Sequence, residues 1–451
     1  MIKHNLTQGD VGKHLYSMTT PMILGIFSIM SMNIVDTFYV GQLGAEPLTA
    51  MAFTIPVIAI LLSLAFGIGI GTSSVIARAI GAQQHTLVKS YTTQALFIAL
   101  SIAIVFAVSG YQAMDQIFSL LGAPKSLMPL IHQFMDIWFL GSFVVVVPMV
   151  GNSAIRAAGN TKLPSYVMMS VALVNIILDP ILIFGLFGFP KMELAGAALA
   201  TVIAYSIAFF LGLYFLAFKF RFLSWKSCYE GVWKSWRAIL RIAIPSVGTN
   251  LIAPISVAVT TWLVALYSPE SVAGFGVASR IESLFLVVIM GLSSIMGPFV
   301  GQNWGAGQYN RVDLALKLSF RFACAWGLGV AILLWFLSAP IAGLFSDDKS
   351  IISSAEHYLQ IIPITYLFLA VIMIASSTSN GMGKPMPSLL MSFLRLIALY
   401  IPLALGLAYL FNLVGIYLAG AIANTIVGIG AYIWVKHLKL ASKTTLNSKT
   451  L

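Results

Sequence analysis

Six ionisable residues lie inside long apolar runs of this 451-residue chain, and their types could do chemistry there. They are Asp36, Asp136, Asp179, Arg280, Glu282 and Arg395. Charged side chains inside membrane-spanning helices are expensive, and they commonly mark ion or substrate pathways. Each is therefore a functional hypothesis, to be weighed against a purely structural role.

Asp36 and Asp179 form the leading candidate site. The apolar runs that carry them begin on the same side of the membrane, and at about 1.5 Å per residue both acids reach a similar depth. Asn175 precedes Asp179 by four residues, so the two share one helix face. Burial favours the neutral form of a carboxyl group, and a neighbouring carboxylate strengthens that preference. The pair is therefore predicted to bind a proton or another cation.

The other ionisable residues are secondary candidates. Asp136 and the Arg280/Glu282 pair lie nearer the outer interface or could neutralise one another, which favours a structural role. Arg395 lies close to the inner end of its run, and its long side chain could reach the interface.

The composition places these residues in a membrane protein. The chain is 59% hydrophobic and 9% charged, whereas soluble domains carry roughly 25% charged residues. Twelve apolar segments each reach the roughly 20 residues that a helix needs to cross the hydrocarbon core, and open strands would leave backbone groups unpaired there. The predicted spans are residues 17–40, 50–77, 91–110, 127–150, 163–187, 194–218, 242–266, 274–300, 318–337, 357–379, 388–411 and 414–435.

The distribution of basic residues predicts the orientation. An even number of spans places both termini on one side, and the outer loops hold only Lys125, Lys191 and Lys349. Most other Lys and Arg residues fall in the inner segments, so both termini are predicted to be cytosolic. The net charge of +11 is explained by this asymmetry, and no nucleic-acid partner is expected.

The chain repeats itself at a shift of 224 residues. Pro21 matches Pro245, Gly67 matches Gly291, and Leu194-Ala195-Gly196-Ala197 matches Leu418-Ala419-Gly420-Ala421. Each repeat holds six spans, so both halves share one orientation. The predicted fold is an all-α membrane protein of twelve transmembrane helices, in two six-helix bundles related by a pseudo-twofold axis along the membrane normal. The expected domains are residues 1–218 and 242–451, joined by a cytosolic linker at 219–241.

The acids do not follow the repeat. Thr260 and Leu403 stand at the counterparts of Asp36 and Asp179. A shared scaffold does not require this asymmetry, so the first half is predicted to couple transport to an ion. Pro21 and Pro180 lie within spans, where proline removes a backbone hydrogen bond and bends a helix, and they are the candidate hinges.

Nucleotide chemistry is not expected. The glycine run at residues 67–71 has no strand before it and fits helix packing, and no Walker A motif follows Gly383-Lys384. Transport is therefore predicted to use an ion gradient, without a cofactor or resident metal. A membrane-embedded enzyme, the rival class, would need clustered acid–base groups at an interface, and none are spaced for that.

Several motifs together resemble a known family. They are Asn33-Ile34-Val35-Asp36-Thr37-Phe38-Tyr39-Val40-Gly41, Ala77-Arg78-Ala79-Ile80-Gly81, Arg156-Ala157-Ala158-Gly159-Asn160 and Gly301-Gln302-Asn303-Trp304-Gly305-Ala306. With the two six-helix repeats, they resemble multidrug and toxic compound extrusion (MATE) transporters. Asn175-Ile176-Ile177-Leu178-Asp179-Pro180 resembles the DinF-like branch.

The resemblance implies an antiporter that expels small cationic or amphiphilic drugs while protons, or sodium ions, enter. It maps the branch's ion network onto Asp36, Asn175 and Asp179, with Asn152 and Thr201 also placed there. A sodium ion would use Asp36, Asn175, Asp179 and Thr201. The chain is then expected to be a monomer among the lipids of a prokaryotic inner membrane.

A mechanism follows as a hypothesis. Proton uptake by Asp36 and Asp179 rearranges their hydrogen bonds and bends the first helix at Pro21, so that the drug leaves. Sodium coupling remains an alternative. So does a lipid or lipid-linked-sugar flippase of the same superfamily, although such proteins usually have fourteen spans and a basic cavity.

Overall fold

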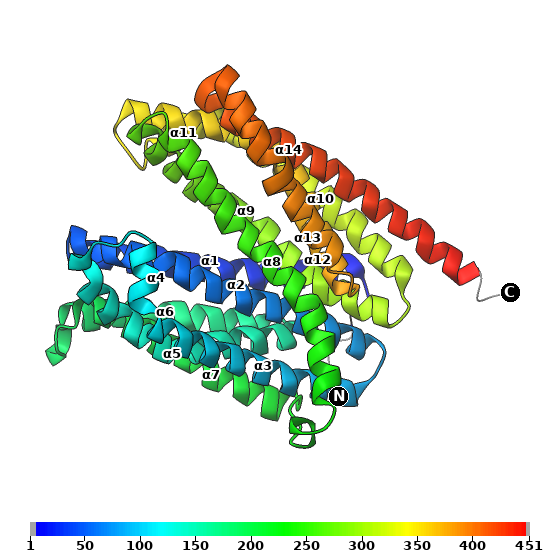
Figure 1. The fold of residues 1–451 in the computed structure, drawn as a ribbon. Coiled ribbons are helices and arrows are strands. Elements are labelled where there is room, and N and C mark those ends of the chain that lie inside the picture. Colours follow the sequence, from blue (N-terminus) through cyan, green and yellow to red (C-terminus); the bar gives the residue numbers. More distant parts are fainter. Residues whose placement is uncertain (1–5, 448–451) are drawn as a thin grey trace. The chain divides into compact units, whose positions relative to one another are not determined.

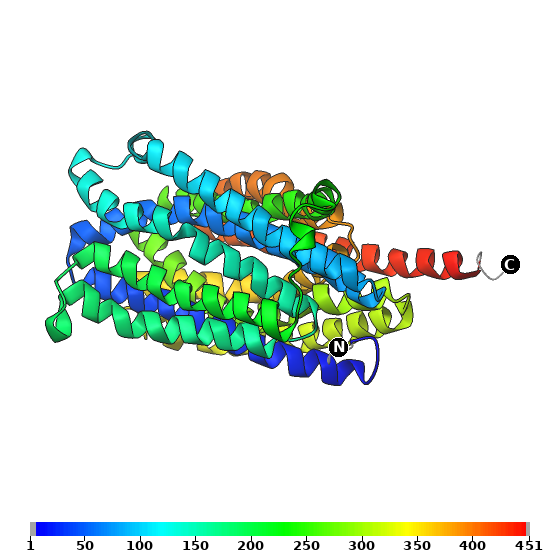
Figure 2. The same ribbon diagram turned by 90° about the horizontal axis from the view of Figure 1, so that it is seen from below.

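The computed structural model describes the backbone of residues 6–447 and the side chains of residues 6–437. Every regular element in this range is helical, as Figures 1 and 2 show. The basic residues Lys3, Lys439, Lys443 and Lys449, which contribute to the predicted orientation, lie outside the described side chains. The cytosolic placement of the termini therefore stays a prediction.

The helices follow one another along the chain with short connections. The first half contains α1 (Val11–Gly41), α2 (Ala45–Gly81), α3 (His85–Gln112), α4 (Met114–Leu120), η1 (Lys125–Leu127), α5 (Met128–Ala157), α6 (Lys162–Phe184), η2 (Leu186–Gly188), α7 (Glu193–Tyr214), η3 (Phe215–Lys219) and η4 (Lys226–Cys228). The second half contains α8 (Val232–Ala265), α9 (Pro269–Gly305), α10 (Tyr309–Ala342), α11 (Lys349–Ile361), η5 (Ile362–Thr365), α12 (Tyr366–Gly381), α13 (Met386–Phe393), η6 (Leu394–Tyr400) and α14 (Ile401–Asn447).

These helices provide twelve spans. Eleven helical stretches of the described chain are long and apolar enough to cross a membrane, and the last one, Met386–His437, contains 52 residues. One crossing needs only about 20 residues. The backbone leaves helical geometry at Asn412 (φ 52°, ψ −138°), and Gly415 lies directly against the backbone of Leu407. The stretch is therefore two spans joined at Asn412, and the predicted twelve-helix fold is confirmed.

Two spans begin or bend where the sequence did not indicate it. Residues 232–241 of the predicted linker already belong to α8. The tenth span is made of α11 and α12, which the 3₁₀ turn η5 joins around Pro363. Proline has no N–H to donate, so a regular helix cannot continue through this point without losing a hydrogen bond.

The contacts divide the chain into two compact units. The first unit contains Thr20–Val247, and the second contains residues 6–19 together with the chain from Gly248 onward. Helices α1 and α8 each contribute to both units, and the change of unit falls beside Pro21 in α1 and shortly after Pro245 in α8. The predicted lobes at 1–218 and 242–451 stay a prediction.

The first unit is a helix bundle whose core consists mostly of Ala, Val and Ile side chains. Helix α5 packs against α2, α3 and α7, and α6 packs against α7 (Figure 1). The glycine run predicted to serve helix packing lies inside α2. A Cβ atom on Gly67 would be 2.8 Å from the Val247 nitrogen, and one on Gly71 would be 2.7 Å from the Ile239 oxygen. These glycines therefore allow α2 and the start of α8 to approach closely.

The segment before α1 is fixed inside the second unit. The Arg311 guanidinium donates to the Gly9 oxygen at 2.7 Å and to the Leu6 oxygen at 3.0 Å. Asn303 Nδ2 also donates to the Leu6 oxygen, at 3.2 Å, and Gln302 Oε1 accepts from the Leu6 nitrogen at 3.2 Å. The Gly301–Ala306 motif thus anchors the beginning of α1.

Candidate functional site

The ends of α1 and α6 position the two predicted acids. Asp36 stands five residues before the end of α1 at Gly41, and Asp179 stands five residues before the end of α6 at Phe184. Both helices belong to the first unit at these positions. The prediction that the two acids reach a similar depth thus agrees with where their helices end.

Asn175 connects α6 to α7. Its Nδ2 donates to Asp179 Oδ1 at 3.2 Å and to Thr201 Oγ1 at 3.3 Å. Asn175 and Asp179 are fully buried, whereas Thr201 is part-buried. The amide nitrogen of Asn175 thus donates to two neighbours, and its amide oxygen has no hydrogen-bond partner among the described residues.

Asp36 completes a group of acceptors. Its carboxyl group interacts electrostatically with that of Asp179. Among the described residues, Asp36 Oδ1, Asp179 Oδ2 and Asn175 Oδ1 are enclosed and have no hydrogen-bond partner. Buried polar atoms nearly always have a partner, and each of these three atoms can only accept from a donor or bind a cation. The acid cluster, defined as Asp36, Asn175, Asp179 and Thr201, therefore lacks what a proton or a small cation would supply.

An apolar layer lies beside the acid cluster. Met32 of α1, Val171 and Ala172 of α6, and Ala204 and Ala208 of α7 form one buried core. This packing fixes the three helices that carry the polar groups, and it keeps their environment poor in other donors. The atoms of the cluster that could bind a proton or a sodium ion are all oxygen atoms, which suits either ion.

Asn152 lies apart from the acid cluster. It stands five residues before the end of α5, and the loop at 158–161 then leads into α6. Counting about 1.5 Å per residue along the two antiparallel helices separates it from Asp179 by about 18 Å along the bundle. The Asn152 amide oxygen is buried and has no partner among the described residues, but the acid cluster does not include it.

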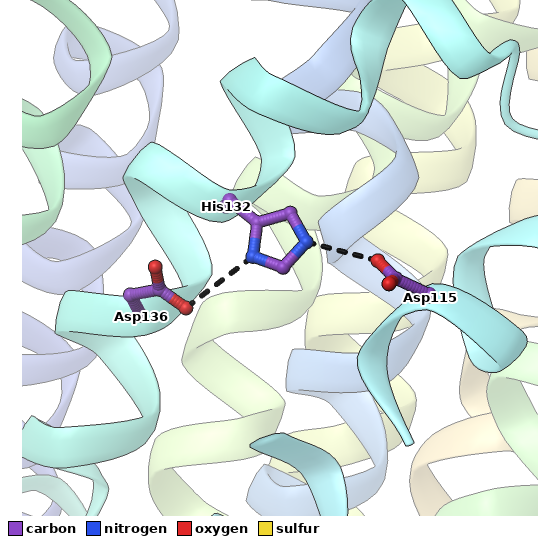
Figure 3. Close-up of polar contacts among 3 residues, drawn as sticks. All are labelled: Asp115, His132 and Asp136. Atoms are coloured by element: carbon purple, nitrogen blue, oxygen red, sulfur yellow. Dashed lines mark hydrogen bonds and ion pairs between the residues drawn. The ribbon is translucent and has the colours of Figure 1, made fainter. Parts of the chain in front are cut away.

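Asp136 belongs to a different group near the start of α5. His132 lies between Asp115 and Asp136, as Figure 3 shows, with ion-pair contacts of 2.9 Å from Nε2 to Asp115 Oδ1 and 3.6 Å from Nδ1 to Asp136 Oδ1. The side chains are 40% (His132), 73% (Asp115) and 41% (Asp136) exposed. His132 and Asp136 are half-buried and Asp115 is exposed, and an ion-pair group of this kind fits the structural role considered for Asp136.

Arg280 and Glu282 do not pair in the described chain. Arg280 is exposed, and Glu282 Oε2 instead accepts from the Tyr358 hydroxyl at 2.6 Å. Arg395 Nη1 donates to Asn424 Oδ1 at 3.1 Å, and Asn424 Nδ2 donates to Thr365 Oγ1 at 3.0 Å.

Arg395 was considered able to reach the inner interface, and in the structure its guanidinium contacts Asn424 of α14. Sequence reasoning missed Tyr358 and Asn424. Their only signal is a polar side chain within an apolar run.

Both candidate hinges lie within helices. Pro21 interrupts α1 and Pro180 interrupts α6, immediately after Asp179. Each removes one donor from its helix and frees a carbonyl four residues earlier. The acids and the points where their helices can bend are therefore close together in α6 and are 15 residues apart in α1.

Twelve apolar helices in two six-span repeats, with three enclosed and unpartnered acceptor atoms in one of them, are the features expected of a membrane transporter. The MatE family model matches this chain twice, at residues 21–181 and 245–405. The chain belongs to this family of MATE transporters. The two matches start 224 residues apart, which is the shift at which the sequence repeats.

Relatives and solved structures agree with this assignment. The chain is 36% identical over 432 residues to the FAD transporter of Shewanella oneidensis, with 95% of each chain covered. It is 25% identical over 424 residues to the multidrug export protein MepA of Staphylococcus haemolyticus, covering 93% of this chain and 92% of MepA. The Vibrio cholerae MATE transporter VcmN in the bent form shares 28% identity and a TM-score of 0.91, over 96% of this chain and 98% of VcmN. Membership of the DinF-like branch stays a prediction.

Proposed function

We propose that this chain exports an organic molecule in exchange for a proton that enters through the acid cluster. The observation that carries the proposal is the set of three enclosed, unpartnered acceptor atoms on Asp36, Asn175 and Asp179. A proton bound by either carboxyl group turns one acceptor into a donor, so it can satisfy a neighbouring oxygen and remove the repulsion between the acids. The cluster is therefore expected to change its hydrogen bonds when it is protonated.

Helix α1 would transmit this change. Its start is anchored in the second unit through Leu6 and Gly9, whereas Asp36 belongs to the first unit. Pro21 lies at the change of unit, where a helix that lacks one hydrogen bond bends more easily. Protonation of Asp36 would then alter the bend at Pro21, with Pro180 as a second flexible point beside Asp179.

Sodium is the alternative coupling ion. The oxygen atoms of Asp36, Asn175, Asp179 and Thr201 are all ligands that a hard cation accepts. Neither proton nor sodium is a resident cofactor in this scheme, and no further cofactor is proposed. A lipid or lipid-linked-sugar flippase remains the rival function for the same fold.

Two substrate classes are candidates. The buried acids favour small cationic or amphiphilic drugs, and the similarity to the multidrug export protein MepA supports a drug as substrate. The 36% identity to a FAD transporter over nearly the whole chain favours a flavin nucleotide. The protein would work as a monomer in the bacterial inner membrane, with both termini in the cytosol.

The test uses the purified protein in proteoliposomes with an imposed pH gradient, with and without sodium. Asp36→Asn removes the titratable group while keeping the side chain's size, so substrate export is expected to fall at least tenfold at normal protein content. Asp115→Asn, which changes an exposed acid of the first unit, serves as the matched control. Export by Asp36→Asn at the wild-type rate would refute the proposal. If export by the wild type requires sodium, the coupling ion is sodium and not the proton.

A further inference from the structure

The second unit contains a polar network of its own. Glu282 of α9, Tyr358 of α11, Thr365 of η5, Arg395 of η6 and Asn424 of α14 are connected by the hydrogen bonds given above. Glu282 also interacts electrostatically with Arg395, which joins the two parts of the set. These five residues and Tyr366, which follows Thr365 in the chain, are called the arginine network below.

The network lies well inside its helices. Arg395 is nine residues from the start of α13 at Met386, which corresponds to about 14 Å along a helix. Glu282 is 13 residues from the start of α9 at Pro269, or about 20 Å. Both residues belong to helical stretches that are long and apolar enough to cross a membrane, where an ionised side chain is costly and its presence calls for a function.

Two irregular helical segments meet at the network. Arg395 belongs to the π-helix η6, and Thr365 ends the 3₁₀ turn η5. π-Helical turns are rare and occur frequently at functional sites, because they widen the spacing of side chains and free backbone groups.

Two groups of the network that can donate a hydrogen bond have no acceptor. Arg395 Nε is enclosed and has no hydrogen-bond partner among the described residues, and neither has the hydroxyl of Tyr366, which is 1% exposed. Tyr366 follows Thr365 directly, and its hydroxyl interacts electrostatically with Glu282. A guanidinium carries five donors and no acceptor, so the missing partner is an acceptor-rich group.

Glu282 does not supply that partner. In the described chain no ion pair within 4.0 Å joins it to Arg395, and one of its oxygens is bound by Tyr358. Its charge balances that of Arg395 at a distance, which lets an arginine stay buried without a bound ligand. Both side chains keep part of their surface accessible, whereas Tyr358 and Tyr366 are buried.

We propose that the arginine network binds the phosphate group of an anionic, soluble substrate, with Arg395 as the main donor and Tyr366 as a second one. Guanidinium groups match phosphate oxygens with two parallel hydrogen bonds, and they do so most strongly where water is scarce. The inference rests on the proposed export function for its biological meaning, and it favours the phosphorylated class of substrate over the cationic one.

Flavins supply a matched series of probes, because riboflavin has no phosphate, FMN has one and FAD has a diphosphate. Binding to the purified full chain in phosphatidylcholine nanodiscs is followed by flavin fluorescence anisotropy. Arg395→Gln is expected to raise the Kd for FMN and FAD at least tenfold and to leave riboflavin within twofold. Tyr366→Phe is expected to raise the Kd for FMN about threefold, the effect of one hydrogen bond.

Arg280→Gln is the control, since it removes the same charge from an exposed position of α9. Monodisperse elution of every variant in detergent shows that it is folded. Equal FAD binding by Arg395→Gln and the wild type would overturn the proposal, as would a wild type that binds neither FMN nor FAD. Asp36→Asn should keep the Arg395-dependent binding, so a failure of ion coupling is separable from a failure of this site.

A phospholipid headgroup carries the same phosphate chemistry as the soluble substrate. The binding assay is therefore repeated in phosphatidylglycerol nanodiscs. Unchanged FAD affinity supports the soluble substrate. A loss of affinity that disappears in Arg395→Gln would identify the lipid as the occupant and overturn the assignment.

Discussion

The acid cluster of the first unit and the arginine network of the second unit have opposite deficits. Asp36 Oδ1 and Asp179 Oδ2 are enclosed acceptors without a partner, whereas Arg395 Nε and the Tyr366 hydroxyl are enclosed groups that can donate and have no partner. We therefore propose a cation as the ligand of the cluster and an anion as the ligand of the network. Two halves that share one sequence repeat thus leave opposite kinds of polar groups unpartnered.

The repeat shows that this difference is confined to a few positions. Thr260 and Leu403 stand where the first half has its acids, and Ile58 and Val171 stand where the second half has Glu282 and Arg395. Ile58 and Val171 pack in apolar cores of the first unit. The scaffold thus accommodates polar and apolar side chains at matching places of the repeat.

The starts of the two repeats differ in the same way. Arg311 and Asn303 hold the segment before α1 by its carbonyl oxygens. Gln94 of α3 donates to the Ser227 oxygen at 2.5 Å and accepts from Trp236 Nε1 at 2.7 Å, which fixes the connector before α8. A charged anchor holds the helix that carries an acid, and an uncharged anchor holds the helix that carries none.

The largest expected effect tests whether the acids of the first unit act together. Asp179→Asn should lower export at least a hundredfold, because its carboxyl group is fully buried and bound to Asn175. Transport in proteoliposomes measures this. Asp136→Asn, which changes the half-buried acid beside His132, should keep at least half of the wild-type rate. A similar loss in both variants would remove the distinction between the acid cluster and the ion-pair group of His132.

The second prediction compares Pro21 with Pro245, its counterpart in the repeat. Pro21→Ala restores a backbone donor in α1 and should lower the transport rate about tenfold by stiffening the helix that carries Asp36. Pro245→Ala makes the same change in α8, which carries no acid, and should lower the rate less than twofold. Stopped-flow export assays give both rates. Equal effects would show that bending is needed in both halves and is not tied to the acids.

The third prediction tests the stability of the arginine network. Tyr358→Phe removes the hydroxyl that donates to Glu282 and should lower the free energy of unfolding by about 2 kcal/mol, since hydrogen bonds to charged groups contribute about that much. Thermal unfolding in detergent measures the change. Tyr409→Phe, at a 90% exposed position, should leave the unfolding temperature unchanged. No difference between the two would mean that Glu282 is not held by Tyr358.

The smallest expected effect compares one matched pair of the repeat. Thr201 accepts from Asn175, whereas its counterpart Thr425 donates to the Ala421 oxygen of its own helix at 2.8 Å. Thr201→Val should lower the transport rate about fivefold, which corresponds to the loss of one hydrogen bond of roughly 1 kcal/mol. Thr425→Val should have less than a twofold effect on the same assay. A larger effect at Thr425 would contradict the placement of ion coupling in the first unit.

The sequence by itself determined the number of spans, the repeat at 224 residues and the pair formed by Asp36 and Asp179. Span length follows from the thickness of the hydrocarbon core, and an acid inside an apolar run has few roles other than function. A helical spacing of four residues also identified Asn175 as the neighbour of Asp179. These features depend on local pattern alone, which is why they could be read without coordinates.

Only the tertiary structure decided which polar groups meet across helices. Periodicity within one helix cannot say that Arg395 turns to Asn424, that Tyr358 binds Glu282, or that Asn152 lies far from Asp179 along the bundle. The π-turn at Leu394–Tyr400 also left no clear mark in the apolar pattern, whereas the break at Asn412 falls between the predicted spans 388–411 and 414–435. In both cases the outcome depends on packing between segments distant in the chain, because tertiary contacts select the partner that leaves the fewest buried groups unpaired.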